Sequence, residues 1–142
     1  MENNREDTIV ILAGYPDKMQ QFIDTNPGLT SRIAFHINFD DYTEEELYEI
    51  LISMASKSGV RLSDEVHEKV IEIFGHVCKH KDFGNGRFVR NIYEQALMNQ
   101  TLRIARSTGQ PSEKELRTLE AEDFNNLEVK ETSEKEGRVI GF

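Results

Sequence analysis

Two arginines that follow turn-forming clusters are the residues whose type and place best suit chemistry. Arg32 comes shortly after Asn26-Pro27-Gly28, and Arg87 directly follows Gly84-Asn85-Gly86. A guanidinium group is always charged and forms paired hydrogen bonds with phosphate oxygens. In phosphoryl transfer, an arginine placed at the transferred group can raise the rate by ~10³–10⁵. Both arginines are therefore candidates for contact with a phosphate, and the alternative for Arg32 is a solvated surface arginine at a turn.

Arg87 lies near the start of a predicted helix, together with two further candidates. Helix starts favour anions, and an arginine there opposes the helix dipole. A bound phosphate would compensate for this placement, and so would an ion pair with one of the many local acids. Gly86 ends the break that opens the helix. Arg90 follows Arg87 by three positions and therefore shares its helix face.

His76, Cys78 and His80 have side chains that bind zinc, but their spacing does not favour a site. On a helix the two histidines share a face, while Cys78 points away from it. Structural zinc requires four converging ligands, and no fourth ligand is evident. We therefore expect a helix end with a buried cysteine and no metal. A single cysteine excludes an internal disulfide, which favours a reducing, cytoplasmic compartment.

Charge and hydropathy narrow the class of partner. The chain has 142 residues and a net charge of −9. Nucleic acids and anionic membranes attract clustered lysine and arginine, so neither is an expected partner. No run reaches the ~18 apolar residues of a membrane span. The polar, acidic start does not resemble a signal peptide. A chain of this length can bury one ordinary core or two small ones.

Two apolar segments near the N-terminus predict strands, with a short helix between them. Residues 8–13 contain an apolar run without polar alternation, which predicts a strand buried on both faces. Residues 35–39 alternate apolar and polar side chains, which predicts a second strand. Residues 17–24 predict a short amphipathic helix.

The chain from residue 43 onward has a helical pattern. Thr43 and Glu46 form a capping box before apolar positions at helical spacing. Further helices are predicted over residues 63 to 79, 87 to 106 and 112–119. The positions expected to face inward on the longest helix are Val89, Ile92, Tyr93, Ala96, Leu97, Ile104 and Ala105.

Several separated segments together resemble a known family. Ile9-Val10-Ile11-Leu12-Ala13-Gly14-Tyr15-Pro16, followed by Asn26-Pro27-Gly28-Leu29-Thr30-Ser31-Arg32-Ile33, resembles the C-terminal half of an AAA+ ATPase module. The resemblance is to the stage V sporulation protein K group, which is related to the red-type rubisco activase CbbX. Phe83-Gly84-Asn85-Gly86-Arg87-Phe88-Val89-Arg90-Asn91 resembles the sensor-2 helix of that group, and Val139-Ile140-Gly141-Phe142 resembles its C-terminus.

The resemblance implies a role for each candidate residue. Arg32 matches the arginine finger, which reaches a nucleotide held by the neighbouring subunit. Arg87, with Gly86 and Arg90 beside it, matches sensor 2, which reaches the γ-phosphate from the lid. Tyr15 falls at the sensor-1 position, where many AAA+ proteins have an asparagine that orients the attacking water. The alternative for Tyr15 is a buried ring at a strand end.

The resemblance also implies the domain organisation. Residues 1–42 would be the C-terminal part of the AAA+ α/β core, with the sensor-1 strand, the arginine-finger segment and the last strand. Residues 43–127 would form a helical lid with sensor 2, and residues 128–142 a polar tail. The expected fold class is an α/β remnant of two strands and a short helix, followed by an all-α lid, and mostly helical overall.

The sequence contains neither a phosphate-loop motif nor an acidic Walker B pair after an apolar strand. The resemblance therefore implies the back half of a ring-forming, cytoplasmic ATPase that uses ATP and Mg²⁺ to remodel a protein. The expected partners are other copies of the chain and a protein substrate, with no nucleic acid and no membrane. Alone, the fragment is expected to be inert and to hold no cofactor. The alternative is a non-catalytic, acidic helical module for protein interaction.

The two predicted strands present a further question. In the family's sheet they are not neighbours, because the strand that leads into the phosphate loop lies between them. Residues 8–13 and 35–39 would then have backbone N–H and C=O groups without partners. We expect them either to pair directly with each other or to pair across chains in a non-native oligomer.

Overall fold

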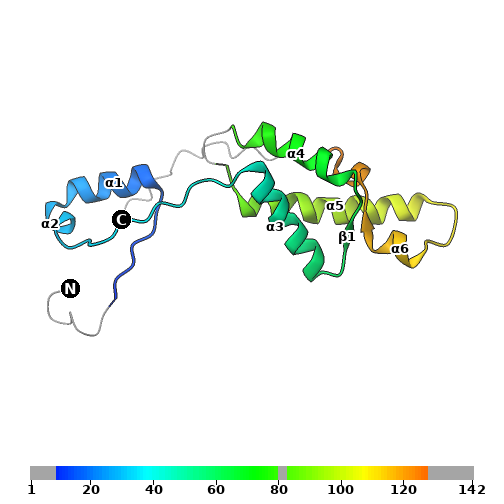
Figure 1. Ribbon diagram of the computed structural model, residues 1–142, viewed down its shortest axis with the longest axis horizontal. Coiled ribbons are helices and arrows are strands. Elements are labelled where there is room, and N and C mark those ends of the chain that lie inside the picture. Colours follow the sequence, from blue (N-terminus) through cyan, green and yellow to red (C-terminus); the bar gives the residue numbers. More distant parts are fainter. Residues whose placement is uncertain (1–8, 80–82, 128–142) are drawn as a thin grey trace, which may run out of the picture. The chain divides into compact units, whose positions relative to one another are not determined.

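A computed structural model describes residues 9–79 and 83–127 of the chain (Figure 1). The chain divides into two compact units, residues 1–40 and residues 41–142. No helix among the described residues is long and apolar enough to cross a membrane.

The first unit contains two helices, α1 (Pro16–Thr25) and α2 (Pro27–Thr30). Each begins with a proline. Proline has no backbone N–H, but an N–H at the first position of a helix would have no partner within the helix, so nothing is lost. The backbone N–H of Asn26 donates to the Ile23 carbonyl oxygen at 3.0 Å, where α1 ends. Ile23 is the buried side chain of α1. The helix predicted over residues 17–24 is therefore confirmed.

Residues 9–13 and 35–39 do not form strands, which corrects the expectation for both segments. Thr8 lies outside the described residues. A strand is stable only when a neighbouring strand pairs with its backbone, and the described part of the chain provides no such neighbour. Four of their apolar side chains are between 82% and 91% exposed: Ile9, Ile11, Phe35 and Phe39. Direct pairing of the two segments is therefore wrong for the single chain, while pairing across chains stays a prediction.

The second unit begins with α3 (Glu44–Lys57), which has the predicted capping box. Thr43 donates its backbone N–H to Glu46 Oε2 at 2.8 Å, and Thr43 Oγ1 accepts the Glu46 N–H at 3.3 Å. Both bonds satisfy donors that a helix start leaves without partners. Beyond the helix end, Gly59 has φ 69°, a left-handed conformation that favours glycine.

The core of the second unit lies between α3, α4 (Val66–Val77) and α5 (Gly86–Arg106) (Figure 1). Each helix repeats apolar residues at helical spacing, so that one face is buried. The buried core residues are Leu47, Leu51, Ala55, Val66, Val70, Phe74, Val89, Ile92, Tyr93, Ala96, Leu119 and Phe124. Ala105 is exposed, contrary to the expectation, because the buried stripe of α5 ends at Gln100.

Two short strands, β1 (Arg61–Leu62) and β2 (Thr118–Leu119), pair in parallel. The Arg61 N–H donates to the Arg117 carbonyl oxygen at 2.7 Å, and the Ser63 N–H donates to the Leu119 carbonyl oxygen at 2.9 Å. The described part of the second unit is helical apart from this pair, whose two-residue strands are too short to leave a pattern in the sequence. The mostly helical fold is confirmed.

Two short helical elements lie on either side of β2. The first, α6 (Glu113–Leu116), is shorter than the helix predicted over residues 112–119, because the residues after it pair in β2. It begins with a capping box between Ser112 and Glu115. The second, η1 (Ala121–Phe124), is a 3₁₀ helix. The predicted polar tail lies outside the described residues.

Candidate functional site

The start of α5 brings three of the predicted site residues together. Gly86 is the first residue of the helix, Arg87 is the second, and Arg90 lies one turn further on. The Arg87 N–H donates to the Gly84 carbonyl oxygen at 2.9 Å, which closes a tight turn before the helix. Within the described α5, the first turn has no acidic residue, and the Asn85 side chain does not cap it. The N–H groups at this helix start therefore favour an anion.

Arg87 and Arg90 add two positive charges at the same place. Both residues are exposed, and their spacing places them on one face of the helix. Among residues 9–79 and 83–127, neither arginine forms an ion pair. A Cβ atom built on Gly86 would meet no described heavy atom within 4 Å, so the space beside it is open. Two guanidinium groups and a helix start can together hold an anion such as a phosphate group.

Aromatic packing holds this helix start against α4. The Phe88 ring centroid lies 6.3 Å from that of Phe74 and 5.3 Å from that of Phe83. These separations are favourable for tilted and edge-to-face aromatic pairs. Val89, the next residue, is fully buried. Because the residues directly after Arg87 are packed, the arginine is attached to a rigid element, as precise binding requires.

Asn85 lies directly before these residues, and its contacts were not predicted from the sequence. Its backbone has φ 45° and ψ −124°, a conformation that residues other than glycine and asparagine rarely adopt. Its Oδ1 accepts the Tyr42 N–H at 3.0 Å, and its Nδ2 donates to Asp41 Oδ1 at 2.6 Å and to the Phe83 carbonyl oxygen at 3.2 Å. An asparagine between two glycines is the signal that could have identified it, because this pattern is typical of turns with positive φ.

Arg32 and Tyr15 belong to the first unit. Arg32 is exposed after α2, where its N–H donates to the Leu29 carbonyl oxygen at 2.9 Å, and its Nη1 lies 3.8 Å from a Cβ atom built on Gly28. Tyr15 precedes α1, and its carbonyl oxygen accepts the Met19 N–H at 2.8 Å. The Tyr15 residue is 74% exposed, so the alternative of a buried ring is wrong. The functional roles of both residues stay predictions.

The thiol of Cys78 faces the start of the second unit. Its Sγ lies 4.0 Å from the Tyr42 carbonyl oxygen. Burial raises the pKa of the Cys78 thiol, and the carboxylates of Glu44 and Asp41 raise it further. A protonated thiol is a poor metal ligand. His80 lies outside the described residues, among which no cluster of three or more histidine, cysteine or acidic side chains could hold a metal.

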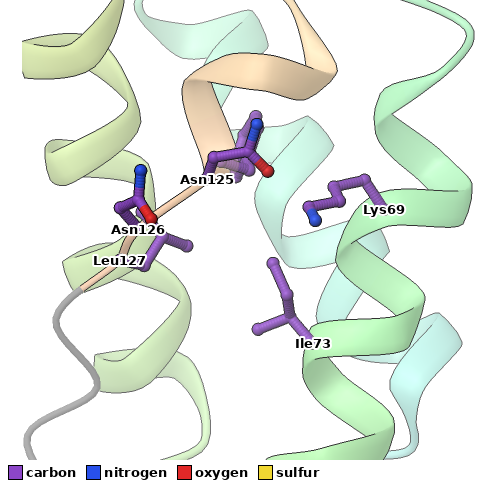
Figure 2. Close-up of a pocket in the computed structure, with 6 residues that line it drawn as sticks. Lys69, Ile73, Asn125, Asn126 and Leu127 are labelled. Atoms are coloured by element: carbon purple, nitrogen blue, oxygen red, sulfur yellow. The ribbon is translucent and has the colours of Figure 1, made fainter.

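Two concave surfaces of the second unit lie away from the predicted site. A pocket of about 570 Å³ separates α4 from the residues that follow η1, and Figure 2 shows Lys69 and Ile73 on one side of it and Asn125, Asn126 and Leu127 on the other. A larger groove of about 890 Å³ is lined by residues of α3, β1 and α6. Neither is lined by any of the predicted site residues, which are Tyr15, Arg32, Gly86, Arg87 and Arg90.

A polar cluster further along α5 was also missed. Gln100 Nε2 donates to the Thr118 carbonyl oxygen at 2.7 Å, and Asn99 Nδ2 donates to the Asp123 carbonyl oxygen at 2.8 Å. Arg103 forms an ion pair with the Asp123 carboxylate at 2.8 Å. The hydrogen bond to Asp123 is the main cause that raises the pKa of Arg103. These groups satisfy one another, so we assign them to the stability of the fold rather than to ligand binding.

The comparison with protein families decides the class of this second unit. The family described as the AAA lid domain matches residues 43–136, which is more than half of the chain and includes every element from α3 to η1. The chain belongs to the AAA lid domain family. The helical core of the second unit is therefore the core of an AAA lid domain.

Individual relatives are similar over nearly the whole chain. A CfxQ homologue from Galdieria sulphuraria is 44% identical over 125 residues, which are 87% of this chain and 41% of that protein. The protein CbbX from Cereibacter sphaeroides is 40% identical over 130 residues, 91% of this chain and 42% of its own length. The chloroplastic ribulose bisphosphate carboxylase/oxygenase activase of Cyanidioschyzon merolae is 40% identical over 125 residues, 87% of this chain and 43% of that protein.

These relatives confirm the resemblance to the CbbX group. The part of the resemblance that concerns stage V sporulation protein K stays a prediction. The chain spans less than half the length of the relatives it matches.

Proposed function

We propose that the chain is the sensor and lid half of an AAA+ ATPase, which assembles into a ring and remodels another protein in the cytoplasm. The observation that carries this proposal is the pair Arg87 and Arg90 at the anion-favouring start of α5. Both are exposed, and within the described residues neither has an acidic partner. In an AAA lid, such a pair is suited to contact the phosphates of a nucleotide that another part of the protein binds.

The residues of this chain fit the phosphate end of ATP and not the whole nucleotide. The guanidinium groups of Arg87 and Arg90 can bind phosphate oxygens. The sequence lacks the phosphate loop and the Walker B acid that hold the phosphates and Mg²⁺ in ATPases of this type. In the proposed parent, another part of the protein binds ATP and Mg²⁺. The isolated chain is accordingly proposed to be inert.

Each arginine has a distinct task in the proposed reaction. Transfer of the γ-phosphoryl group spreads negative charge over its oxygens, and a nearby cation stabilises that charge. Arg87 is proposed to contact the γ-phosphate as sensor 2, with Gly86 and Arg90 beside it. Arg32 is proposed to act as the arginine finger on the nucleotide of the neighbouring subunit. Tyr15 occupies the proposed sensor-1 position.

The rate of phosphate release by a full-length protein that contains this chain tests the proposal. Arg87→Ala should lower ATP turnover by about 10²-fold, the order expected when one group that stabilises transition-state charge is removed. Arg106→Ala is the matched control, because Arg106 is an exposed arginine at the other end of the same helix. Equal turnover in the two variants would contradict the proposed role of α5.

A second candidate is the non-catalytic, acidic module for protein interaction. It is favoured by Met98 and Leu102 on α5, which are 67% and 51% exposed, and by the net charge of −9. Exposed apolar side chains within a polar surface are typical of sites that bind other proteins. If the full-length protein released no phosphate but bound a protein through this strip, the second candidate would replace the first.

A further inference from the structure

The first residues of the second unit form hydrogen bonds with the side chain of Asn85. The boundary between the two units falls between Asp40 and Asp41. Asn85 Nδ2 donates to the Asp41 carboxylate at 2.6 Å, and Asn85 Oδ1 accepts the Tyr42 N–H at 3.0 Å. The two residues in each contact are far apart in the sequence: Tyr42 precedes Asn85 by 43 positions, and Asp41 precedes it by 44. One side chain therefore attaches the first two residues of the unit to the segment before α5.

Asparagine is the residue type that this position requires. Its amide has both a donor and an acceptor, so a single side chain can bind a carboxylate and a backbone N–H together. Asparagine also tolerates a positive φ better than most residues do. The bond to the charged Asp41 is of the stronger, charge-assisted kind. A second contact lies near the same point. Cys78, directly after α4, has its Sγ 4.0 Å from the Tyr42 carbonyl oxygen.

Asn85 also lies in the tight turn that directly precedes Arg87. The Gly84 carbonyl oxygen accepts the N–H of Arg87 at 2.9 Å and that of Phe88 at 3.4 Å. Asn85 lies inside this turn, with φ 45° and ψ −124°. A displacement of Arg87 must therefore move Asn85 with it or break the bonds of the turn.

We propose that Asn85 is a positioning residue that couples Arg87 to the connection at Asp41 and Tyr42. When Arg87 contacts a phosphate, Asn85 transmits the displacement to the residues through which the lid is attached. This inference rests on the proposed function of Arg87. Asn85 itself does not touch the nucleotide. Loss of the Asn85 side chain therefore uncouples turnover from binding, because its hydrogen bonds join the turn before Arg87 to Asp41 and Tyr42.

The first test uses Asn85→Gly in a full-length protein that contains this chain. Glycine adopts the same backbone conformation, so the change removes the hydrogen bonds of the side chain without adding strain. The expected result is an ATP dissociation constant within about twofold of wild type and a kcat about tenfold lower, inside the range of about 5–150-fold for coupled sites. Asn126→Gly is the matched control, because Asn126 also has a positive φ, 54°, and lies in the pocket beside η1.

A second variant, Asp41→Ala, keeps the test decisive if Asn85→Gly does not fold, since Asp41 is exposed. Asp41→Ala should also lower kcat without weakening ATP binding, and the double variant should lose little more than either single one. Wild-type kcat in Asn85→Gly or Asp41→Ala would overturn the coupling, and so would a parallel loss of ATP affinity. If Arg87→Ala also had no effect, the proposed function itself would fail; if only Arg87→Ala lowered turnover, the coupling alone would fail.

Discussion

Arg103 and Asp123 form a two-bond ion pair, with Nε donating to Oδ1 at 2.9 Å and Nη2 donating to Oδ2 at 2.8 Å. The Asp123 carboxylate is 1% exposed and also accepts the Glu120 N–H at 2.9 Å. The pair joins α5 to η1 and so fixes the C-terminal elements of the second unit on its longest helix. Removing one partner of such a pair leaves a buried charge without compensation.

We therefore predict that Arg103→Ala lowers the free energy of unfolding by about 3 kcal/mol. The control is Arg117→Ala, which removes an exposed pair with Glu113 at 3.2 Å and should cost only about 0.3–0.5 kcal/mol. Urea denaturation followed by circular dichroism measures both values. Equal losses in the two variants would show that the buried pair does not hold η1 in place.

The capping box at α3 should make stability depend on pH in acid. The hydrogen bond from the Thr43 backbone N–H lowers the pKa of Glu46 below its ordinary value of 4.5, and the bond from the Thr43 hydroxyl makes a smaller contribution in the same direction. A lowered pKa in the folded state gives stability that is fully present above the unfolded pKa and is lost as the pH falls through the folded value. The difference in unfolding free energy between wild type and Glu46→Ala should therefore shrink below pH 4.5. A difference that stayed constant in acid would exclude the charged capping bond.

The helical lid should fold independently of the first unit. Its buried side chains lie on three helices that contact one another, so its core does not require the first unit. Hydrogen exchange should be slowest for amides in residues 47–55, 66–77 and 89–100. A variant that begins at residue 41 should show the same protection as the whole chain. Uniformly fast exchange in these helices would contradict an autonomous lid.

Arg32→Ala in a full-length protein should abolish ATP turnover and leave nucleotide binding nearly intact. An arginine finger acts on the transition state of the neighbouring subunit, so its loss lowers the rate by ~10³-fold or more without removing the binding site. Phosphate release and calorimetric titration with ATP measure the two quantities. Loss of binding together with turnover would identify Arg32 as a structural residue.

The helices of the lid were predictable because their signals are local. Thr43 and Glu46 lie within one turn of each other, and the apolar positions of α3 repeat within the same segment. The candidate site was predictable to the same extent. Gly86, Arg87 and Arg90 come together because they follow one another in a single helix, so placing that helix also places the site.

The remaining features depend on contacts between distant residues. Arg103 and Asp123 are 20 positions apart, and Asn85 and Asp41 are 44 positions apart. No periodic pattern in the sequence reports such pairs. The segments 8–13 and 35–39 show the opposite case, in which a sequence pattern is present but the predicted strand does not form. Apolar runs indicate the capacity to form a strand, but a strand also requires a partner, which the described chain does not supply.

The most direct test of the central claim compares the affinities of a full-length protein for ATP and for ADP, with and without Arg87. If Arg87 contacts the γ-phosphate, Arg87→Ala should weaken ATP binding about tenfold, as expected for loss of a charge-assisted hydrogen bond, and leave ADP binding unchanged. Arg106→Ala should change neither affinity. Equal weakening of ATP and ADP, or no change in either, would contradict the assignment of the α5 start as the phosphate-sensing end of the lid.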